Sequence, residues 1–271
     1  MSRLHLNFLK KYKSLQETID LAEYLNDESF LYSLQEKPFK YVVIDNFFKP
    51  EFLNQIKEKF DKTIELGLTE DHNDLSRFRF FNPKINYDGY LFTPQLTDEE
   101  PLKLFYSLNW NLFFSKMFNK PTTFGTNFAL HHHPTGDRTG WVHNDYATFV
   151  FPQLRKLSNG VHRTFKEEQD GLDRPKGDLP EPYLQKRVIA LIYYFNNDEW
   201  KEGDGGETGL YSSKNIDDLV AKIAPINNRM LAFDISPKSF HAFQKNLKER
   251  NCFVQWFHSD LEWCEEKYGF I

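Results

Sequence analysis

The spacing of hydrophobic positions divides the chain into a helical first part and a strand-rich second part. Residues 1–37 carry apolar positions at helical spacing among charged ones, which predicts short supporting helices. Residues 41–48 form an apolar run that predicts a buried strand. Pro50 then begins a stretch with apolar positions one helical turn apart, and a similar stretch covers residues 101–118. Both predict helices, since proline is favoured in a helix's first turn.

The second part consists of short apolar runs separated by Gly, Pro, Asn and Asp. The predicted strands cover residues 122–132, 140–151, 187–195, 208–212, 229–235, 239–243 and 251–258. Many short strands after helices are typical of a β-sandwich or barrel with helices on one side. The polar residues 68–98 predict turns, and the charged, Pro- and Gly-containing residues 153–186 predict an insertion that is a candidate lid.

Composition favours one large β domain. The chain has 271 residues, 40% of them hydrophobic, and its 27 Phe and 13 Tyr can fill a sandwich core. We therefore expect a single domain over residues 1–271, with residues 1–37 as helical support and residues 38–260 as the core with its packing helices.

Charge and apolar runs exclude several partners. The formal net charge is −5 with no basic stripe, so nucleic acid is not an expected partner. No apolar run approaches the roughly 18 residues of a membrane helix, and the N-terminus lacks a signal peptide's apolar core. The chain has only two cysteines, Cys252 and Cys264. We expect a cytoplasmic protein that does not bind membranes.

The motif His-x-Asp occurs three times, beginning at His72, His143 and His258. A site made of two histidines and one carboxylate leaves three metal positions open, but it needs a second histidine on a neighbouring strand. His72 lies in a polar stretch and no histidine follows His258. His143 and Asp145 precede an apolar run, and His241 lies at the centre of a later predicted strand. These three residues are therefore the candidate metal ligands.

Arg250 adds a cation nine residues after His241. A guanidinium can bind both oxygens of a carboxylate at once, which suits the distal carboxylate of a dicarboxylic acid. The alternative is a core imidazole at His241 and a surface arginine that begins a strand.

With these residues in place, residues 130–257 resemble the prolyl 4-hydroxylase-like group of 2-oxoglutarate and Fe(II) dioxygenases. The family's His-x-Asp resembles residues 143–145, its strand with paired tyrosines resembles residues 187–196, and its glycine-leucine stretch resembles residues 205–210. Its distal histidine and basic residue resemble His241 and Arg250. Residues 38–47 are also similar to the start of such domains.

The resemblance implies a mainly β fold, a double-stranded β-helix or distorted, cupin-like jelly roll. It implies Fe(II), 2-oxoglutarate and O2, with ascorbate as an optional reductant, and a hydroxylase that releases succinate and CO2. Tyr194 would help Arg250 to bind 2-oxoglutarate. Candidate substrate-pocket residues are His133, Trp141, Arg187 and Trp256.

Three departures from the family pattern limit what carries over. Residues 131–134 read His-His-His-Pro where the family commonly has a tyrosine, so that contact is lost or made by His133. The insertion at residues 153–186 lies beside the expected substrate entrance, and two extra residues loosen the glycine-leucine spacing. Asp145 is present, whereas related halogenases have a small residue there, so hydroxylation is favoured.

Several alternatives remain open. A demethylase of the AlkB type resembles a pattern with a second arginine six residues after the first, but position 256 is Trp. We expect a small polar or amino-acid-type substrate, with a peptidyl, prolyl-type residue as the alternative. A non-catalytic cupin-like binding protein is the alternative from another class, because a jelly roll by itself does not imply chemistry.

Overall fold

The computed structural model describes most of the chain. The described residues are 19–69, 77–83, 85–91, 101–123, 125–151, 155–156, 162–163, 183–197 and 199–269. None of the helices among them is long and apolar enough to cross a membrane.

The helix predicted after Pro50 is α2 (Pro50–Glu65). Pro50 occupies its first turn, and its buried side chains, which include Phe52, Ile56 and Phe60, recur once per turn. Within residues 1–37 the described part contains only the 3-10 helices η1 (Leu21–Glu23) and η2 (Asp27–Phe30), shorter than the amphipathic helices that we expected.

The second predicted helix is two elements, η3 (Leu102–Tyr106) and α4 (Leu108–Phe118). Ser107 separates them, because its backbone is extended and its hydroxyl accepts a hydrogen bond from the Trp110 amide at the start of α4. Asn119 ends α4 in the left-handed conformation.

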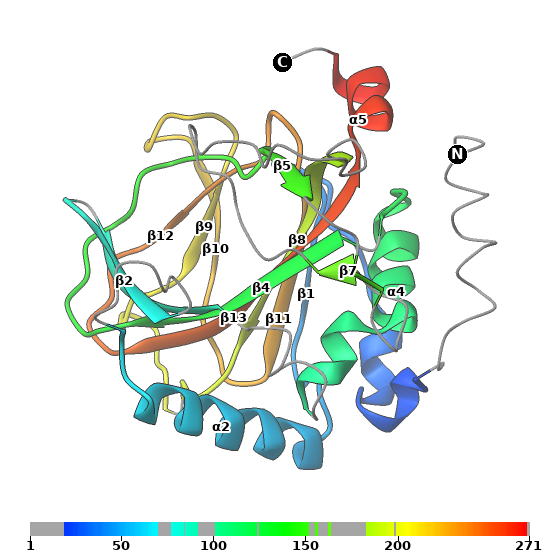
Figure 1. The fold of residues 1–271 in the computed structure, drawn as a ribbon. Coiled ribbons are helices and arrows are strands. Elements are labelled where there is room, and N and C mark those ends of the chain that lie inside the picture. Colours follow the sequence, from blue (N-terminus) through cyan, green and yellow to red (C-terminus); the bar gives the residue numbers. More distant parts are fainter. Residues whose placement is uncertain are drawn as a thin grey trace.

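Two antiparallel sheets face each other (Figure 1). The major sheet has the strand order β1 (Tyr41–Ile44), β11 (Arg229–Asp234), β8 (Tyr183–Tyr194), β13 (Arg250–Asp260), β4 (Gly125–His133), β3 (Ile85–Leu91) and β2 (Arg77–Asn82). The minor sheet has the order β10 (Leu219–Ile223), β9 (Thr208–Tyr211) and β12 (Phe240–Phe243). Short strands β5 (Thr148–Phe151), β6 (Arg155–Lys156) and β7 (His162–Arg163) join the major sheet.

Each face of the major sheet covers a separate core. Because side chains alternate along a strand, Phe253 and Phe257 of β13 face the core under α2 and α4, whereas Cys252 and Val254 face the minor sheet. Leu210 of the minor sheet completes this second core. The result is the predicted jelly roll with helices on one outer face.

The structure corrects three local predictions. Residues 68–98, predicted as turns, contain the hairpin β2–β3. Residues 140–151 form a strand only from Thr148, and an unpredicted helix, α5 (Leu261–Tyr268), follows β13. Of the predicted insertion, residues 155–156 and 162–163 add the short strands β6 and β7 and residues 183–186 begin β8; its other residues lie outside the described part.

A buried ion pair joins the C-terminal end of α4 to the major sheet. Lys120 pairs with Asp234 and donates hydrogen bonds to the carbonyls of Val188 (3.1 Å) and Ile235 (2.9 Å). Burial lowers the pKa of Lys120 and raises that of Asp234, while their mutual attraction opposes both shifts.

Lys120→Met is expected to lower the free energy of unfolding by about 3–5 kcal/mol, since it leaves the Asp234 carboxylate buried without its cation. The double variant Lys120→Met with Asp234→Asn should recover most of this loss. Urea unfolding followed by circular dichroism measures both, and a cost below about 1 kcal/mol for the single variant would contradict the prediction.

Candidate active site

A pair of backbone hydrogen bonds brings the two candidate histidines together. The His143 amide donates to the His241 carbonyl (3.0 Å), and the His241 amide donates to the His143 carbonyl (2.8 Å). This isolated bridge joins the segment after β4 to β12, and it leaves the imidazole centroids 4.4 Å apart. His143 therefore lies on a single bridge and not within a long strand.

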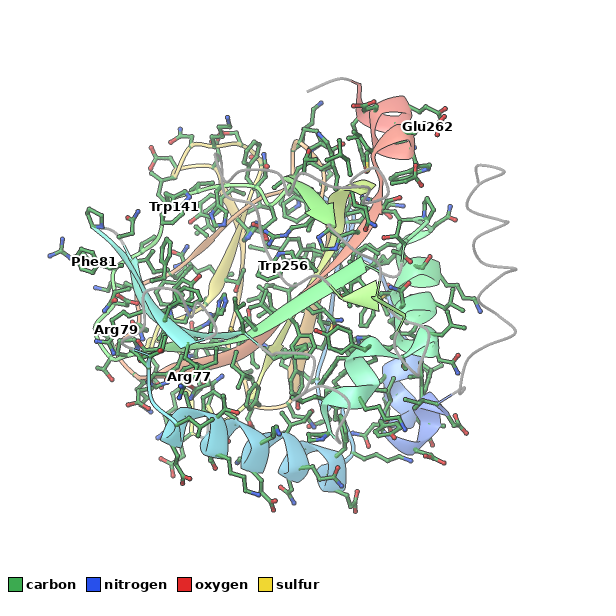
Figure 2. The ribbon with its side chains drawn as sticks, viewed as in Figure 1. Arg77, Arg79, Phe81, Trp141, Trp256 and Glu262 are labelled. Atoms are coloured by element: carbon green, nitrogen blue, oxygen red, sulfur yellow. The ribbon has the colours of Figure 1, made fainter. Side chains whose placement is uncertain are left out.

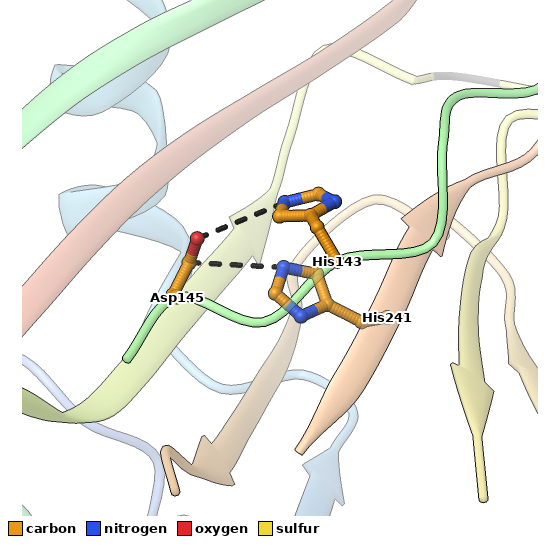
Figure 3. Close-up of side chains that lie close together, drawn as sticks. All are labelled: His143, Asp145 and His241. Atoms are coloured by element: carbon orange, nitrogen blue, oxygen red, sulfur yellow. Dashed lines mark ion pairs between the residues drawn. The ribbon is translucent and has the colours of Figure 1, made fainter. Parts of the chain in front are cut away.

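Asp145 completes the cluster (Figure 3). Its Oδ1 lies 3.7 Å from His143 Nε2, and its Oδ2 lies 3.7 Å from His241 Nε2. One ligand atom from each of the three residues lies within 4.8 Å of the other two. Two imidazole nitrogens and one carboxylate oxygen at this spacing suit a divalent transition metal and leave its other positions open.

Local hydrogen bonds fix how the His-x-Asp turn presents these side chains. His143 Nδ1 lies 3.0 Å from the Trp141 carbonyl, which turns Nε2 toward Asp145. The Asn144 side chain accepts from the Tyr146 amide and donates to the Pro237 carbonyl, the latter over 3.3 Å. Asn144 thus ties the turn to the loop before β12, a role that sequence reasoning did not assign.

The charges around Asp145 keep its carboxylate ionised. Burial by itself would raise the pKa of Asp145, but His241, Arg187 and His143 together with a hydrogen bond from Trp256 outweigh burial and lower it to about 2. Burial lowers the pKa of His241 to about 4, so its imidazole is neutral near pH 7. An ionised carboxylate beside a neutral imidazole is the state that a metal ion requires.

The Arg250 side chain is buried and makes only weakly polar contacts with the described residues around it. Its guanidinium donates to the Thr208 hydroxyl and to Cys252 Sγ, each over 3.2 Å, and faces the ring of Tyr194. Among the residues that the structure describes, no carboxylate lies within ion-pair distance, and Nε has no hydrogen-bond partner. An unpaired buried cation is costly, so the site is suited to an anionic ligand.

The hydroxyl groups of Tyr194 and Thr208 lie 2.6 Å apart beside this guanidinium. Tyr194 was predicted from the sequence, whereas Thr208 was not, because a threonine on a short strand carries no signal of its own. Gly205 allows the preceding loop to approach, since its φ is +76° and a Cβ there would collide with the Lys245 carbonyl oxygen.

Burial lowers the pKa of His131 to about 3; the positive charge of Arg250 also lowers it, and the negative charge of Asp145 opposes both. His133, the predicted pocket residue, stacks on Phe243 at 4.3 Å instead, with burial also lowering its pKa. Both point to the same face of β4, two residues apart.

A row of rings, the aromatic wall, leads from the metal cluster to the β2–β3 hairpin. The ring centroid of Trp141 lies 5.4 Å from that of His143 and 6.0 Å from that of Phe80. Tyr87 stacks on Phe80 at 5.1 Å and on His131 at 4.3 Å. We define the wall as Phe80, Tyr87, His131, Trp141 and Trp256; Figure 2 shows Trp141 on the side of β2 and Trp256 near the centre.

Of the two weaker His-x-Asp motifs, the structure describes only the second. His258 is buried within β13 and is not a member of the cluster, and His72 lies outside the described residues. Trp256 and Arg187, both predicted as pocket residues, lie beside Asp145, so the structure brings them together with the candidate ligands.

Comparisons with known proteins agree with this arrangement. Residues 142–258 match the sequence model of the 2OG-Fe(II) oxygenase superfamily. The prolyl 3-hydroxylase OGFOD1 of Xenopus laevis is 33% identical over 84 residues, which are 28% of this chain and only 16% of that relative's length.

Two solved structures share the fold. A Pseudomonas putida prolyl-4-hydroxylase is 12% identical and superposes with a TM-score of 0.51, covering 80% of this chain and 91% of its own. A prolyl 4-hydroxylase from Phytophthora capsici is 20% identical with a TM-score of 0.51, covering 83% of this chain and 60% of its own. Residues 142–258, which are similar to the 2OG-Fe(II) oxygenase superfamily, include all three members of the metal cluster and Arg250.

Proposed function

We propose that the protein is an Fe(II)- and 2-oxoglutarate-dependent hydroxylase. His143, Asp145 and His241 would hold the iron, and Arg250 would bind the distal carboxylate of 2-oxoglutarate. The observation that carries the proposal is the pairing of a metal-ligating cluster with a buried guanidinium that lacks a carboxylate partner in the described chain. A non-catalytic binding protein has no need of this combination.

The residues around the cation have distinct tasks in this proposal. Thr208 and Tyr194 would hold the guanidinium in one orientation and offer hydroxyl groups to the same carboxylate. His131, neutral at pH 7, would fill the space between the cation and Asp145 without adding a charge. Phe243 and Tyr194 flank the guanidinium and keep water from competing with the ligand.

Bound iron and 2-oxoglutarate supply the oxidising chemistry in this family. Overall, a substrate C–H group, O2 and 2-oxoglutarate would give the alcohol, succinate and CO2, which conserves every atom; ascorbate would serve only to keep the iron reduced. The protein's own contribution is to position the substrate and to exclude water.

For the substrate, we propose a prolyl-type residue within a peptide. The aromatic wall offers ring faces that suit a saturated five-membered ring, and it reaches the β2–β3 hairpin through Phe80. The similarity to a prolyl 3-hydroxylase supports the same substrate class.

A free amino acid or another small polar molecule is the second candidate. Arg187 favours it, because its buried guanidinium lies 3.9 Å from Asp145 Oδ1 at the same cluster and could bind a substrate carboxylate. In a peptide, an uncharged amide replaces this carboxylate, so Arg187 would have no negative charge of the substrate to bind.

Organisation and location remain predictions. We propose one oxygenase domain over residues 1–271, with the insertion at residues 153–186 as a lid. A reducing cytoplasm is supported by Cys252 and Cys264, which are both buried and not joined in a disulfide.

Anaerobic titration of Fe(II) and 2-oxoglutarate tests the cofactor site. Wild-type protein should develop the metal-to-ligand charge-transfer absorption, and His143→Ala should abolish it. Arg250→Met should need at least about 30-fold more 2-oxoglutarate, equivalent to roughly 2 kcal/mol, since a buried carboxylate would lose its charged partner. The matched control is His132→Ala, which removes an imidazole bonded to Asn251 outside the cluster and should keep the band. No band in wild-type protein with iron present would refute the proposed function.

Arg250→Met should also stabilise the ligand-free protein. Removing an unpaired buried cation is expected to raise the free energy of unfolding by about 1 kcal/mol or more. Fe(II) with 2-oxoglutarate at 100 times its dissociation constant should stabilise wild-type protein by about 2.7 kcal/mol and the variant far less. Lys248→Met, which removes an exposed cation, is the control. Clear destabilisation by Arg250→Met in the absence of ligand would contradict this prediction.

Mass spectrometry of reaction mixtures distinguishes the two substrate candidates. We expect one oxygen atom to be added to a proline within capped peptides, with matching succinate release, and no addition to free L-proline. If free amino acids are oxidised instead, and Arg187→Met removes that activity, the second candidate is correct.

A further inference from the structure

A side chain of β13 holds the carboxylate of Asp145. Trp256 Nε1 donates a hydrogen bond of 2.7 Å to Asp145 Oδ2. An indole N–H can only donate, so it stabilises the ionised carboxylate and occupies one lone pair of that oxygen. Among the described residues, Oδ1 accepts no hydrogen bond that competes with a metal ion; its neighbours are His143 Nε2 at 3.7 Å and Arg187 at 3.9 Å.

Arg187 fixes the indole in turn. Its guanidinium carbon lies 4.0 Å from the centre of the Trp256 ring, which is a close cation–π contact. Trp256 is therefore held on one face by Arg187 and at its N–H by Asp145. The indole has little freedom to rotate away from the carboxylate.

A register shift between β8 and β13 brings Arg187 to this face. Trp256 pairs with Ala190 and Phe257 with Ile189, but the next residue of β13, His258, pairs with Arg187. Val188 is the extra residue of the bulge, and both Val188 and Ile189 face the helix-side core. Without the shift, strict alternation would point Arg187 toward that core and away from Trp256.

We propose that Trp256 is a positioning residue that holds Asp145 through Oδ2, so that the carboxylate binds the metal ion through Oδ1 alone. A carboxylate that bound through both oxygens would occupy a further metal position. Binding through one oxygen leaves that position to 2-oxoglutarate or O2. The inference rests on the proposed function, because it concerns a ligand of the proposed iron.

Cobalt(II) binding to the full chain, measured without 2-oxoglutarate, tests this role apart from turnover. Trp256→Phe keeps an aromatic ring under Arg187 but removes the N–H. We expect it to weaken cobalt(II) binding by about 10- to 100-fold, as loss of a group that orients a ligand does. We also expect weaker visible absorption, because a second carboxylate oxygen raises the coordination number of the ion.

Trp263→Phe is the matched control. It removes an indole of α5 whose ring lies 6.1 Å from that of Tyr268 and which makes no described hydrogen bond to Asp145, so cobalt(II) affinity and spectrum should be unchanged. If circular dichroism shows that Trp256→Phe does not fold, the Arg187→Met variant is tested in its place. It frees the indole, so the same spectral change is expected; the affinity is not compared, because the variant also removes a cation 3.9 Å from Asp145 Oδ1.

The outcomes separate the two proposals. If wild-type protein binds cobalt(II) and the folded variant shows the same affinity and spectrum, the positioning role is wrong and the proposed function stands. If wild-type protein does not bind the ion, the proposed function fails, and this inference fails with it.

Discussion

Two hydrogen bonds between the backbones of His143 and His241 hold the site together. They join the segment that follows β4 to β12. Because β4 belongs to the major sheet and β12 to the minor sheet, these bonds connect the two sheets at the site. A second contact, from the Gly140 amide to the Phe243 carbonyl (2.9 Å), continues the same seam. Because main-chain groups make these bonds, the pairing of the two segments fixes the separation of the His143 and His241 backbones, from which the two imidazoles extend.

Three of the buried cations in the described part of the chain have different kinds of partner. The ammonium group of Lys120 pairs with a carboxylate and donates to two carbonyl oxygens, so its charge and its hydrogen-bond donors have partners within the fold. Arg187 is shared between an indole face and the Asp145 carboxylate. Among the described residues, Arg250 has a hydroxyl, a thiol and ring faces but no carboxylate. Since an unpaired buried charge is expensive, an anionic ligand has much to contribute beside Arg250.

The failures of sequence reasoning have local causes. The hairpin β2–β3 was missed because arginines alternate with phenylalanines in a polar stretch, and an edge strand needs apolar side chains on one face only. Helix α5 was missed because its cap, Asp260, looked like the start of a polar tail, although its side chain accepts from the Trp263 amide. The run from Gly140 was assigned to a strand, yet its backbone bonds to β12 at Gly140 and at the isolated bridge of His143 without forming a regular ladder.

By itself the sequence determined a β-sandwich or barrel class, the helix after Pro50, and the choice of His143, Asp145, His241 and Arg250 as candidate site residues. The alternation of apolar residues, the position of proline and the spacing of motifs are local properties, so they can be recognised without knowing which strands pair. Only the tertiary structure decided that Thr208 meets Arg250 and that Trp256 meets Asp145. These contacts join residues 42 and 111 positions apart, and strand register sets them through hydrogen bonds that no local pattern encodes.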